Sequence, residues 1–320
     1  MTRKENLLAA IHRTGPEWVP NGMENTIRLY PPILERPLSA GKDAFGCIWD
    51  LTEGAVGGTY SREGDHILHD LKDWKNVVKF PDVEMFDWEY VQNQVGNLNR
   101  DEFLFEGFVE MGLFERSYLL LGMENALINY MLEPELMFEL VSAIADYKIK
   151  FIQKFDDMID LDMVWFGDDW GSQHNLLIPP DKWREIIKPN LKRVYDCMKE
   201  RGIIINQHSC GKIEDVFGDV VELGADMWNM CQPCNNLKKM KNEYGDRISF
   251  HGGIDSQFVL NAPDASVEGI IEEVKLRITE MAPGGGYIAG PSHTIPSHKP
   301  ELLEAFYGAI DEYGGSAYKK

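Results

Sequence analysis

The chain has 320 residues, of which 44% are hydrophobic and 26% charged, a composition typical of a soluble globular protein that leaves room for one large α/β domain or two smaller ones. Its formal net charge of −20 argues against nucleic acid or an anionic membrane surface as the main partner, because both would repel it, although one local basic patch for a docking protein is compatible. Five scattered cysteines lack the density of a secreted disulfide scaffold and are interpreted as reduced thiols of a cytoplasmic protein.

The N-terminal quarter predicts a helix, a short strand and an insertion. Thr2 and Glu5 form a capping-box pattern at the start of an amphipathic helix. Residues 18–23 are expected to form a short strand, and Glu24 follows it where a buried site could use a carboxylate. Residues from about 37 to 81 combine glycine-rich and aromatic stretches, which predicts short antiparallel strands and turns. This insertion is a candidate lid or substrate wall, and a plain surface excursion is an equal alternative.

From residue 103 onward, strand patterns alternate with helix patterns, which indicates parallel strands joined by right-handed crossovers. Strands are expected at 103–108, 163–166, 203–207, 226–230, 248–250 and 287–289, and helices at about 113–127, 133–158, 180–201, 213–223, 237–244, 266–281 and 300–313. We predict one domain over residues 1–320, a distorted (β/α)8 TIM barrel with a small antiparallel insertion near the N-terminus. Seven strands are counted, so closure is an inference. No glycine-rich phosphate motif follows the first strand, which disfavours a dinucleotide-binding fold.

Residues that can do chemistry follow the predicted strands, at the end of a barrel where enzymes of this architecture place their sites. They are Asp168, Asp169, His208, Cys210, Cys231, Gln232, Asp255 and His293. His208 and Cys210 are two residues apart at a strand end, so they are expected to project to the same side. Imidazole and thiolate together are a zinc-type pair. The alternative is a buried strand end with a satisfied histidine and an inert thiol.

The remaining candidates each allow more than one role. Asp168 and Asp169 could be a general base, a substrate hydrogen-bond acceptor, or the N-cap of the next segment. A Cys-x-x-Cys pair beginning at Cys231 resembles half of a metal knuckle, but no second pair completes it, and Cys231 could instead be a further metal ligand. His293 also follows a strand, so it could converge with Cys210 across the barrel mouth.

Four motifs in this order resemble the uroporphyrinogen decarboxylase superfamily and, more closely, its corrinoid-dependent methyltransferase branch. They are Gly-Asp-Asp-Trp-Gly at 167–171, His-Ser-Cys-Gly at 208–211, Phe-His-Gly-Gly-Ile-Asp at 250–255, and Gly-Gly-Gly-Tyr-Ile-Ala-Gly-Pro-Ser-His at 284–293. The resemblance covers residues 160–310 well and implies a distorted (β/α)8 barrel. True uroporphyrinogen decarboxylases carry an Arg-rich motif after the first strand that holds an acidic tetrapyrrole, whereas residues 21–25 here read Asn-Gly-Met-Glu-Asn, which disfavours porphyrinogen decarboxylation.

Methyltransferases of this branch use a zinc at the barrel mouth, bound by a His-x-Cys motif and a later Cys. The resemblance therefore implies that His208, Cys210 and His293 bind the metal, with an imidazole at the third position in place of a thiolate. Zinc would either hold a methyl-accepting thiol as thiolate or act as a Lewis acid on the leaving group of a methylated donor, so that cobalt(I) of a corrinoid takes the methyl. Asp168 or Asp169 is expected to orient the substrate or manage a proton.

The expected function is methyl transfer from a small methylated substrate to a separate corrinoid protein. The aromatic side chains of Phe45, Trp49, Trp165 and Trp170 would suit an O-methyl aromatic substrate. Glu24 and Asp255 are further candidates for the pocket wall. The chain lacks an Asp-x-His-x-x-Gly cobalamin signature, so the corrinoid should arrive on the partner. Two rivals stay open: transfer from a methylcorrinoid to a thiol or tetrahydrofolate, and a non-catalytic paralogue that binds a small ligand. A homodimer is also left open.

Overall fold

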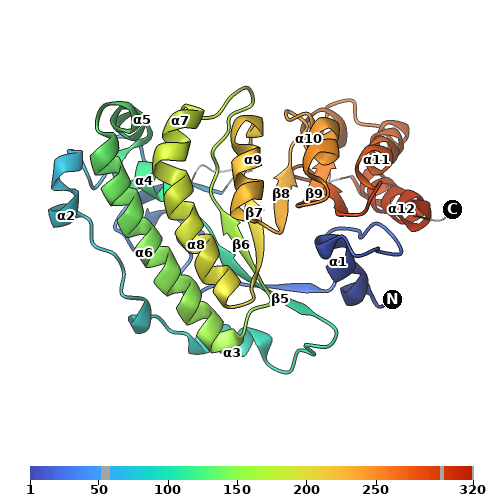
Figure 1. Cartoon of the computed structure of the whole chain (residues 1–320), viewed down its shortest axis with the longest axis horizontal. Coiled ribbons are helices and arrows are strands. Elements are labelled where there is room, and N and C mark those ends of the chain that lie inside the picture. Colours follow the sequence, from blue (N-terminus) through green and yellow to red (C-terminus); the bar gives the residue numbers. More distant parts are fainter. Residues whose placement is uncertain (52–57, 296–298, 319–320) are drawn as a thin grey trace.

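The computed structural model describes residues 1–51, 58–295 and 299–318 (Figure 1). The strands are β1 (Thr26–Leu29), β2 (Gly41–Lys42), β3 (Ile48–Leu51), β4 (Thr59–Ser61), β5 (Leu104–Val109), β6 (Met163–Gly167), β7 (Ile204–His208), β8 (Met227–Cys231), β9 (Ser249–Ile254) and β10 (Tyr287–Pro291). The helices are α1 (Arg3–His12), α2 (Trp74–Val77), α3 (Glu89–Val95), α4 (Leu113–Leu121), α5 (Met123–Leu132), α6 (Pro134–Ile159), α7 (Pro180–Lys182), α8 (Lys188–Glu200), α9 (Glu214–Leu223), α10 (Leu237–Tyr244), α11 (Val267–Met281) and α12 (Pro300–Ser316). Single 3-10 turns occur at Leu71–Asp73 and Val83–Met85, and π-helical turns at Trp183–Ile187 and Ser256–Leu260.

Seven strands form one curled parallel sheet in the order β1-β5-β6-β7-β8-β9-β10, with the long helices along its outer face (Figure 1). Strands β6 and β9 are buried along their whole length, which is the pattern of a parallel sheet covered on both faces. Asn21 pairs with Ala289 of β10, so the segment that enters β1 also joins the last strand to the first. The predicted α/β class and barrel-like sheet are confirmed.

The first strand and one helix differ from the prediction. The strand expected at 18–23 is replaced by β1, because Gly22 adopts a left-handed φ of 68° and the chain turns before the β-branched residues that begin β1. The helix expected at 113–127 is two helices, α4 and α5. Gly122 separates them with a φ of 82°, a conformation that interrupts a right-handed helix.

Helix α1 covers the amino ends of the strands. Its apolar side chains form a separate buried cluster with residues from four strands of the sheet. The members are Leu7, Ala10, Ile11, Leu104, Met163, Met227 and Ile288. Because this end is filled by a helix, the carboxyl ends of the strands are left to form a site. Within the described residues, no helix has both the length and the apolar character that crossing a bilayer requires.

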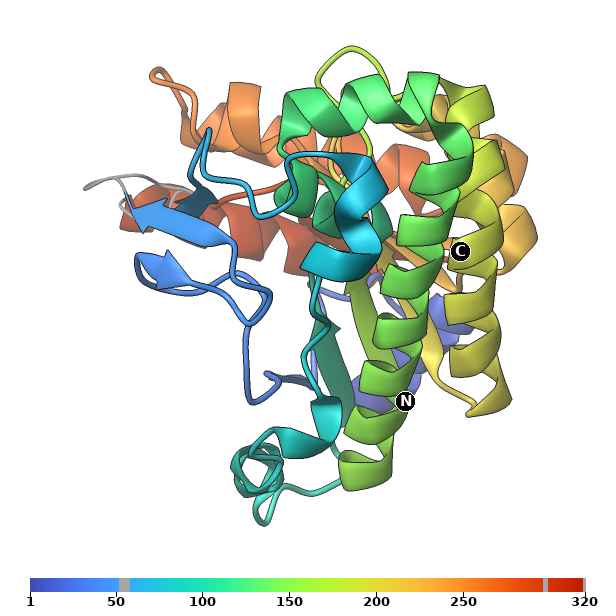
Figure 2. The same ribbon diagram turned by 90° about the vertical axis from the view of Figure 1, so that its left-hand side faces the viewer.

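The insertion forms the antiparallel sheet β2-β3-β4, which stands apart from the parallel strands (Figure 2). It is anchored by charge: the buried guanidinium of Arg116 on α4 lies 2.8 Å from carboxylate oxygens of both Glu35 and Asp43. Lys148 of α6 adds an ion pair of 2.5 Å to Glu35. The predicted insertion is therefore confirmed, although its glycine-rich stretch 54–57 lies outside the described residues.

Candidate metal centre

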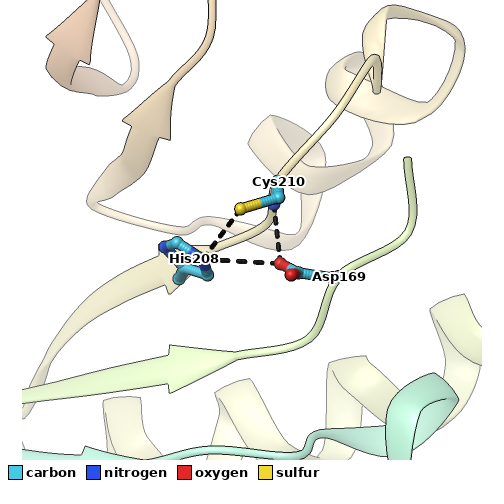
Figure 3. Close-up of side chains that lie close together, drawn as sticks. All are labelled: Asp169, His208 and Cys210. Carbon is cyan, nitrogen blue, oxygen red and sulfur yellow. Dashed lines mark hydrogen bonds and ion pairs between the residues drawn. The ribbon is translucent and has the colours of Figure 1, made fainter. Parts of the chain in front are cut away.

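Three potential metal ligands meet where β6 and β7 end (Figure 3). One ligand atom from each of Asp169, His208 and Cys210 lies within 4.8 Å of the others. The Nε2 atom of His208 is 3.4 Å from Asp169 Oδ1 and 3.5 Å from Cys210 Sγ. The backbone N–H of Cys210 donates to the same Asp169 oxygen at 2.7 Å. The predicted same-side projection of His208 and Cys210 is what the structure shows.

Strand register and two glycines bring these residues together. Gly167 at the end of β6 is paired with His208 at the end of β7, so the loop after β6 runs beside the loop after β7. The two loops are in backbone contact: a Cβ atom on Gly211 would lie 2.2 Å from the carbonyl of Gly171. Gly211 also has a φ of 78°, which a larger residue rarely adopts. Glycine at these positions therefore lets the loop carrying Asp169 approach the strand carrying His208.

The three side chains are partly buried, and their charges influence one another. Burial opposes protonation of His208, but its hydrogen bonds to Asp169 and Cys210 outweigh burial and raise its pKa well above the ordinary value. Burial alone would raise the pKa of Asp169, yet the hydrogen bond and charge of His208 keep it below the ordinary value. Burial raises the pKa of the Cys210 thiol despite the opposing effect of His208. In the absence of a metal, the carboxylate of Asp169 is therefore ionised and lies beside the imidazolium form of His208.

The donor set fits zinc. Carboxylate oxygen, imidazole nitrogen and thiolate sulfur are all accepted zinc ligands, and three protein ligands leave a fourth position for a substrate. Bonds of about 2.0 Å to nitrogen or oxygen and 2.3 Å to sulfur place neighbouring ligands of a tetrahedral site about 3.3–3.5 Å apart. The separations of 3.4 and 3.5 Å around His208 Nε2 match this spacing.

His293, the third ligand implied by the resemblance, lies elsewhere. It is exposed, follows β10 rather than a neighbour of β7, and its backbone N–H donates to Ser256 Oγ at 2.8 Å. It is not in the ligand group found among the described residues, and Asp169 occupies that place. Its side chain instead lines a cavity of about 520 Å³ together with Asp255 and Phe258.

Asp168 and Trp170 serve the fold rather than the ligand group. The carboxylate of Asp168 is fully buried and accepts from the backbone N–H groups of residues 113, 114 and 115 at 2.9–3.1 Å, which caps the start of α4. Its Oδ2 also accepts from the indole N–H of Trp170 at 2.8 Å, and the Trp170 ring packs against Trp183. Asp168 therefore caps a helix, but this helix is α4, which lies earlier in the chain, and not the segment after Asp168 for which a capping role was considered.

The other predicted pocket residues do not belong to the group of three ligands. Trp49 is 3% exposed and donates to Asp43 within the insertion. Glu24 accepts from the backbone N–H of Asn21 and lines a second cavity of about 610 Å³ beside β10. Asp255 caps the turn at 256–260, and its backbone N–H donates to Glu273.

Comparisons with known proteins identify the family of this chain and a solved structure of similar fold. The family model for uroporphyrinogen decarboxylase (URO-D) matches residues 56–313. The chain belongs to the uroporphyrinogen decarboxylase family. A solved methyltransferase from Methanosarcina mazei is similar over 98% of this chain and 99% of its own, with a TM-score of 0.70 and 18% sequence identity. A sugar phosphate isomerase/epimerase from Parabacteroides distasonis matches over 73% of this chain and 92% of its own, with a TM-score of 0.36 and 11% identity. No curated protein sequence matches the chain.

In this member of the uroporphyrinogen decarboxylase family, sequence reasoning missed the polar residues inside the barrel. Asn229 on β8 and His251 on β9 are buried and bonded to each other, and Asn229 is also bonded to His208. Glu115 is buried behind Asp169, and burial followed by the neighbouring carboxylates raises its pKa well above the ordinary value. For Asn229 and His251, the available signal was a polar residue inside an otherwise apolar parallel strand, which is expensive to bury without a partner.

Proposed function

We propose that this chain is a methyltransferase that moves a methyl group from a small methylated substrate to the cobalt of a separate corrinoid protein. The reaction would take place at a zinc centre formed by Asp169, His208 and Cys210. The observation that carries the proposal is the convergence of these three ligand atoms within 4.8 Å at the carboxyl end of the barrel. Family membership and the likeness in fold to a methyltransferase support it.

Each ligand residue has a defined part. Asp169 and the thiolate form of Cys210 would balance the charge of a divalent ion, and His208 would bind through Nε2, the nitrogen that faces them. Zinc held there would supply Lewis acidity to the heteroatom from which the methyl group departs. The chain's own contribution is to hold the three ligands together at the end of β7 and on the loops that follow β6 and β7, where the Asp169 side chain is 36% exposed.

The cavity lined by His293 lies beside this centre. Gln232, one of its lining residues, accepts a hydrogen bond of 2.7 Å from the backbone N–H of Gly211, the residue after Cys210. Its volume of about 520 Å³ falls within the range of small-molecule sites. Phe258, which is 67% exposed, gives the lining one aromatic face among amides and hydroxyls. A small methylated molecule with both an apolar ring and hydrogen-bonding groups, such as an O-methyl aromatic, suits this lining.

The test combines metal analysis with a methyl-transfer assay. We expect about one zinc per chain in the protein purified without chelator and loss of zinc in Cys210→Ala. With cob(I)alamin as the corrinoid, a panel of methyl ethers, thioethers and amines should include a donor that consumes the cobalt(I) absorbance and yields methylcobalamin. The panel run in reverse, with methylcobalamin and thiols or tetrahydrofolate, tests transfer in the other direction. Failure to take up zinc when it is supplied would rule out this centre.

A further inference from the structure

Asn229 lies behind the proposed metal centre and contacts three aromatic or imidazole rings. Its side chain is in the barrel interior, and the residue is 5% exposed. The carbonyl oxygen Oδ1 lies 2.9 Å from the indole Nε1 of Trp165 and 2.8 Å from Nδ1 of His208. The amide nitrogen Nδ2 lies 2.7 Å from Nδ1 of His251. Every polar atom of this amide therefore has a partner.

The indole of Trp165 fixes which way the amide points. An indole N–H can only donate, so the atom of Asn229 that faces Trp165 must be the acceptor oxygen. The opposite orientation would set an NH2 group against the indole N–H and leave both donors without an acceptor. The nitrogen Nδ2 is then left to donate to His251, which accepts through Nδ1. This assignment follows from hydrogen-bond polarity alone.

The same oxygen determines the tautomer of His208. Because Oδ1 of Asn229 can only accept, the Nδ1 atom of His208 must carry a proton and donate it. The lone pair of the ring in its neutral form is then on Nε2, which faces Asp169 Oδ1 at 3.4 Å and Cys210 Sγ at 3.5 Å. The Trp165 ring also lies 4.5 Å from the His208 ring, centroid to centroid, at 33°, and limits its rotation.

We propose that Asn229 is a positioning residue that selects Nε2 of His208 as the metal-binding nitrogen and holds the ring toward the other two ligands. The inference rests on the zinc centre of the proposed function. Partners that orient a metal-binding histidine through its second nitrogen are usually carboxylates or backbone carbonyls. Here the side-chain amide of Asn229 orients His208, and hydrogen bonds to Trp165 and His251 hold the amide in place.

The experiment compares Asn229→Leu with Asn229→Asp. Leucine has a similar volume but no acceptor, so zinc affinity, measured by competition with a chromophoric chelator, should fall about 10–100-fold. Aspartate retains the acceptor for His208 and should stay within about threefold of the unmodified protein. Asn190→Leu removes a fully buried asparagine on α8 whose amide donates to the Ile186 carbonyl, and it controls for the loss of a buried amide that is not bonded to a ligand.

Nitrogen NMR of ¹⁵N-histidine-labelled, zinc-loaded protein gives a second readout that requires no variant. We expect the proton of His208 on Nδ1 and the metal on Nε2; the reverse arrangement would overturn the inference. Zinc affinity of folded Asn229→Leu equal to that of the unmodified protein would also overturn it, while leaving the zinc centre intact. If the unmodified protein itself takes up no zinc, the proposed function fails, and the role of Asn229 fails with it.

Discussion

Asp169 Oδ1 lies 3.4 Å from His208 Nε2, although the two residues are 39 positions apart in the sequence. The contact exists because β6 and β7 are neighbours in the sheet, and the residues that follow them leave the barrel side by side. Strand β10, which precedes His293, is separated from β7 by β8 and β9. The order of the strands in the sheet therefore brings Asp169, and not His293, to His208 and Cys210.

The first prediction separates Asp169 from His293 as the third ligand. Asp169→Asn keeps the shape of the side chain but removes its charge, and zinc affinity should fall by at least about tenfold. Loss of a residue that only hydrogen-bonds to a metal ligand already costs about this much, so loss of a ligand should cost at least as much. His293→Ala should change zinc affinity by less than about twofold. Chelator competition on both variants measures the contrast. The opposite ranking would restore His293 as the third ligand.

The second prediction concerns Asp168 and stability. Asp168→Ala removes the acceptor for three backbone N–H groups at the start of α4 and for the indole of Trp170. The free energy of unfolding should fall by about 2–4 kcal/mol, since a lost cap and unsatisfied buried donors add. Urea denaturation measures the change, with the exposed Asp264→Ala as the matched control. Unchanged stability together with lost activity would assign Asp168 to chemistry instead.

The later strands and helices could be predicted from the sequence because their hydrophobic periodicity and the turn residues that bound them indicate the same elements. Predicted strand 226–230 is observed at Met227–Cys231, and predicted helix 237–244 is observed at Leu237–Tyr244. The first strand could not be placed because Pro20 and Gly22 interrupt an apolar run whose strand character lies after the turn. A local sequence pattern is enough to place a helix or strand when all of its residues follow the same periodicity.

Contacts between elements could be predicted only in part. His208 and Cys210 share one strand end, so their convergence follows from the period of two in a strand. The place of Asp169 depends on which strands are adjacent, and the burial of Trp170 depends on packing against Trp183. The support of His208 by Asn229 joins residues 21 positions apart on β7 and β8. These relations require the sheet order, which spacing along the chain does not contain.

The third prediction addresses the ion pairs that hold the insertion. Arg116→Met leaves the buried carboxylates of Glu35 and Asp43 without their shared cation. Such a loss destabilises proteins by about 3–5 kcal/mol, so urea denaturation should show a drop of this order. Trypsin should also cut within the insertion faster. The control is Arg62→Met, which breaks an exposed pair with Asp50 in the same small sheet and should have a much smaller effect.

The fourth prediction is a pH dependence of stability that comes from Glu110, which follows β5. Burial is the main cause that raises the pKa of Glu110 from 4.5 to about 7. The backbone N–H of Arg36 lowers this pKa, the charge of Glu35 raises it further, and the charge of Lys148 lowers it in part. The folded protein therefore binds this proton more tightly than the unfolded chain does. The stability from this group is complete below pH 4.5 and is lost as the pH rises through 7.

Glu110→Gln cannot ionise and should avoid this loss. Its free energy of unfolding relative to the unmodified protein should be near constant below pH 4.5 and increase by up to about 3 kcal/mol by pH 8, which is the value of a shift of this size. Urea denaturation at pH 4.5, 6, 7 and 8 measures the difference, and the exposed Glu304→Gln controls for the loss of one negative charge. A flat difference across this range would mean that Lys148, whose Nζ donates to the Glu110 carbonyl at 2.7 Å, also neutralises the Glu110 carboxylate.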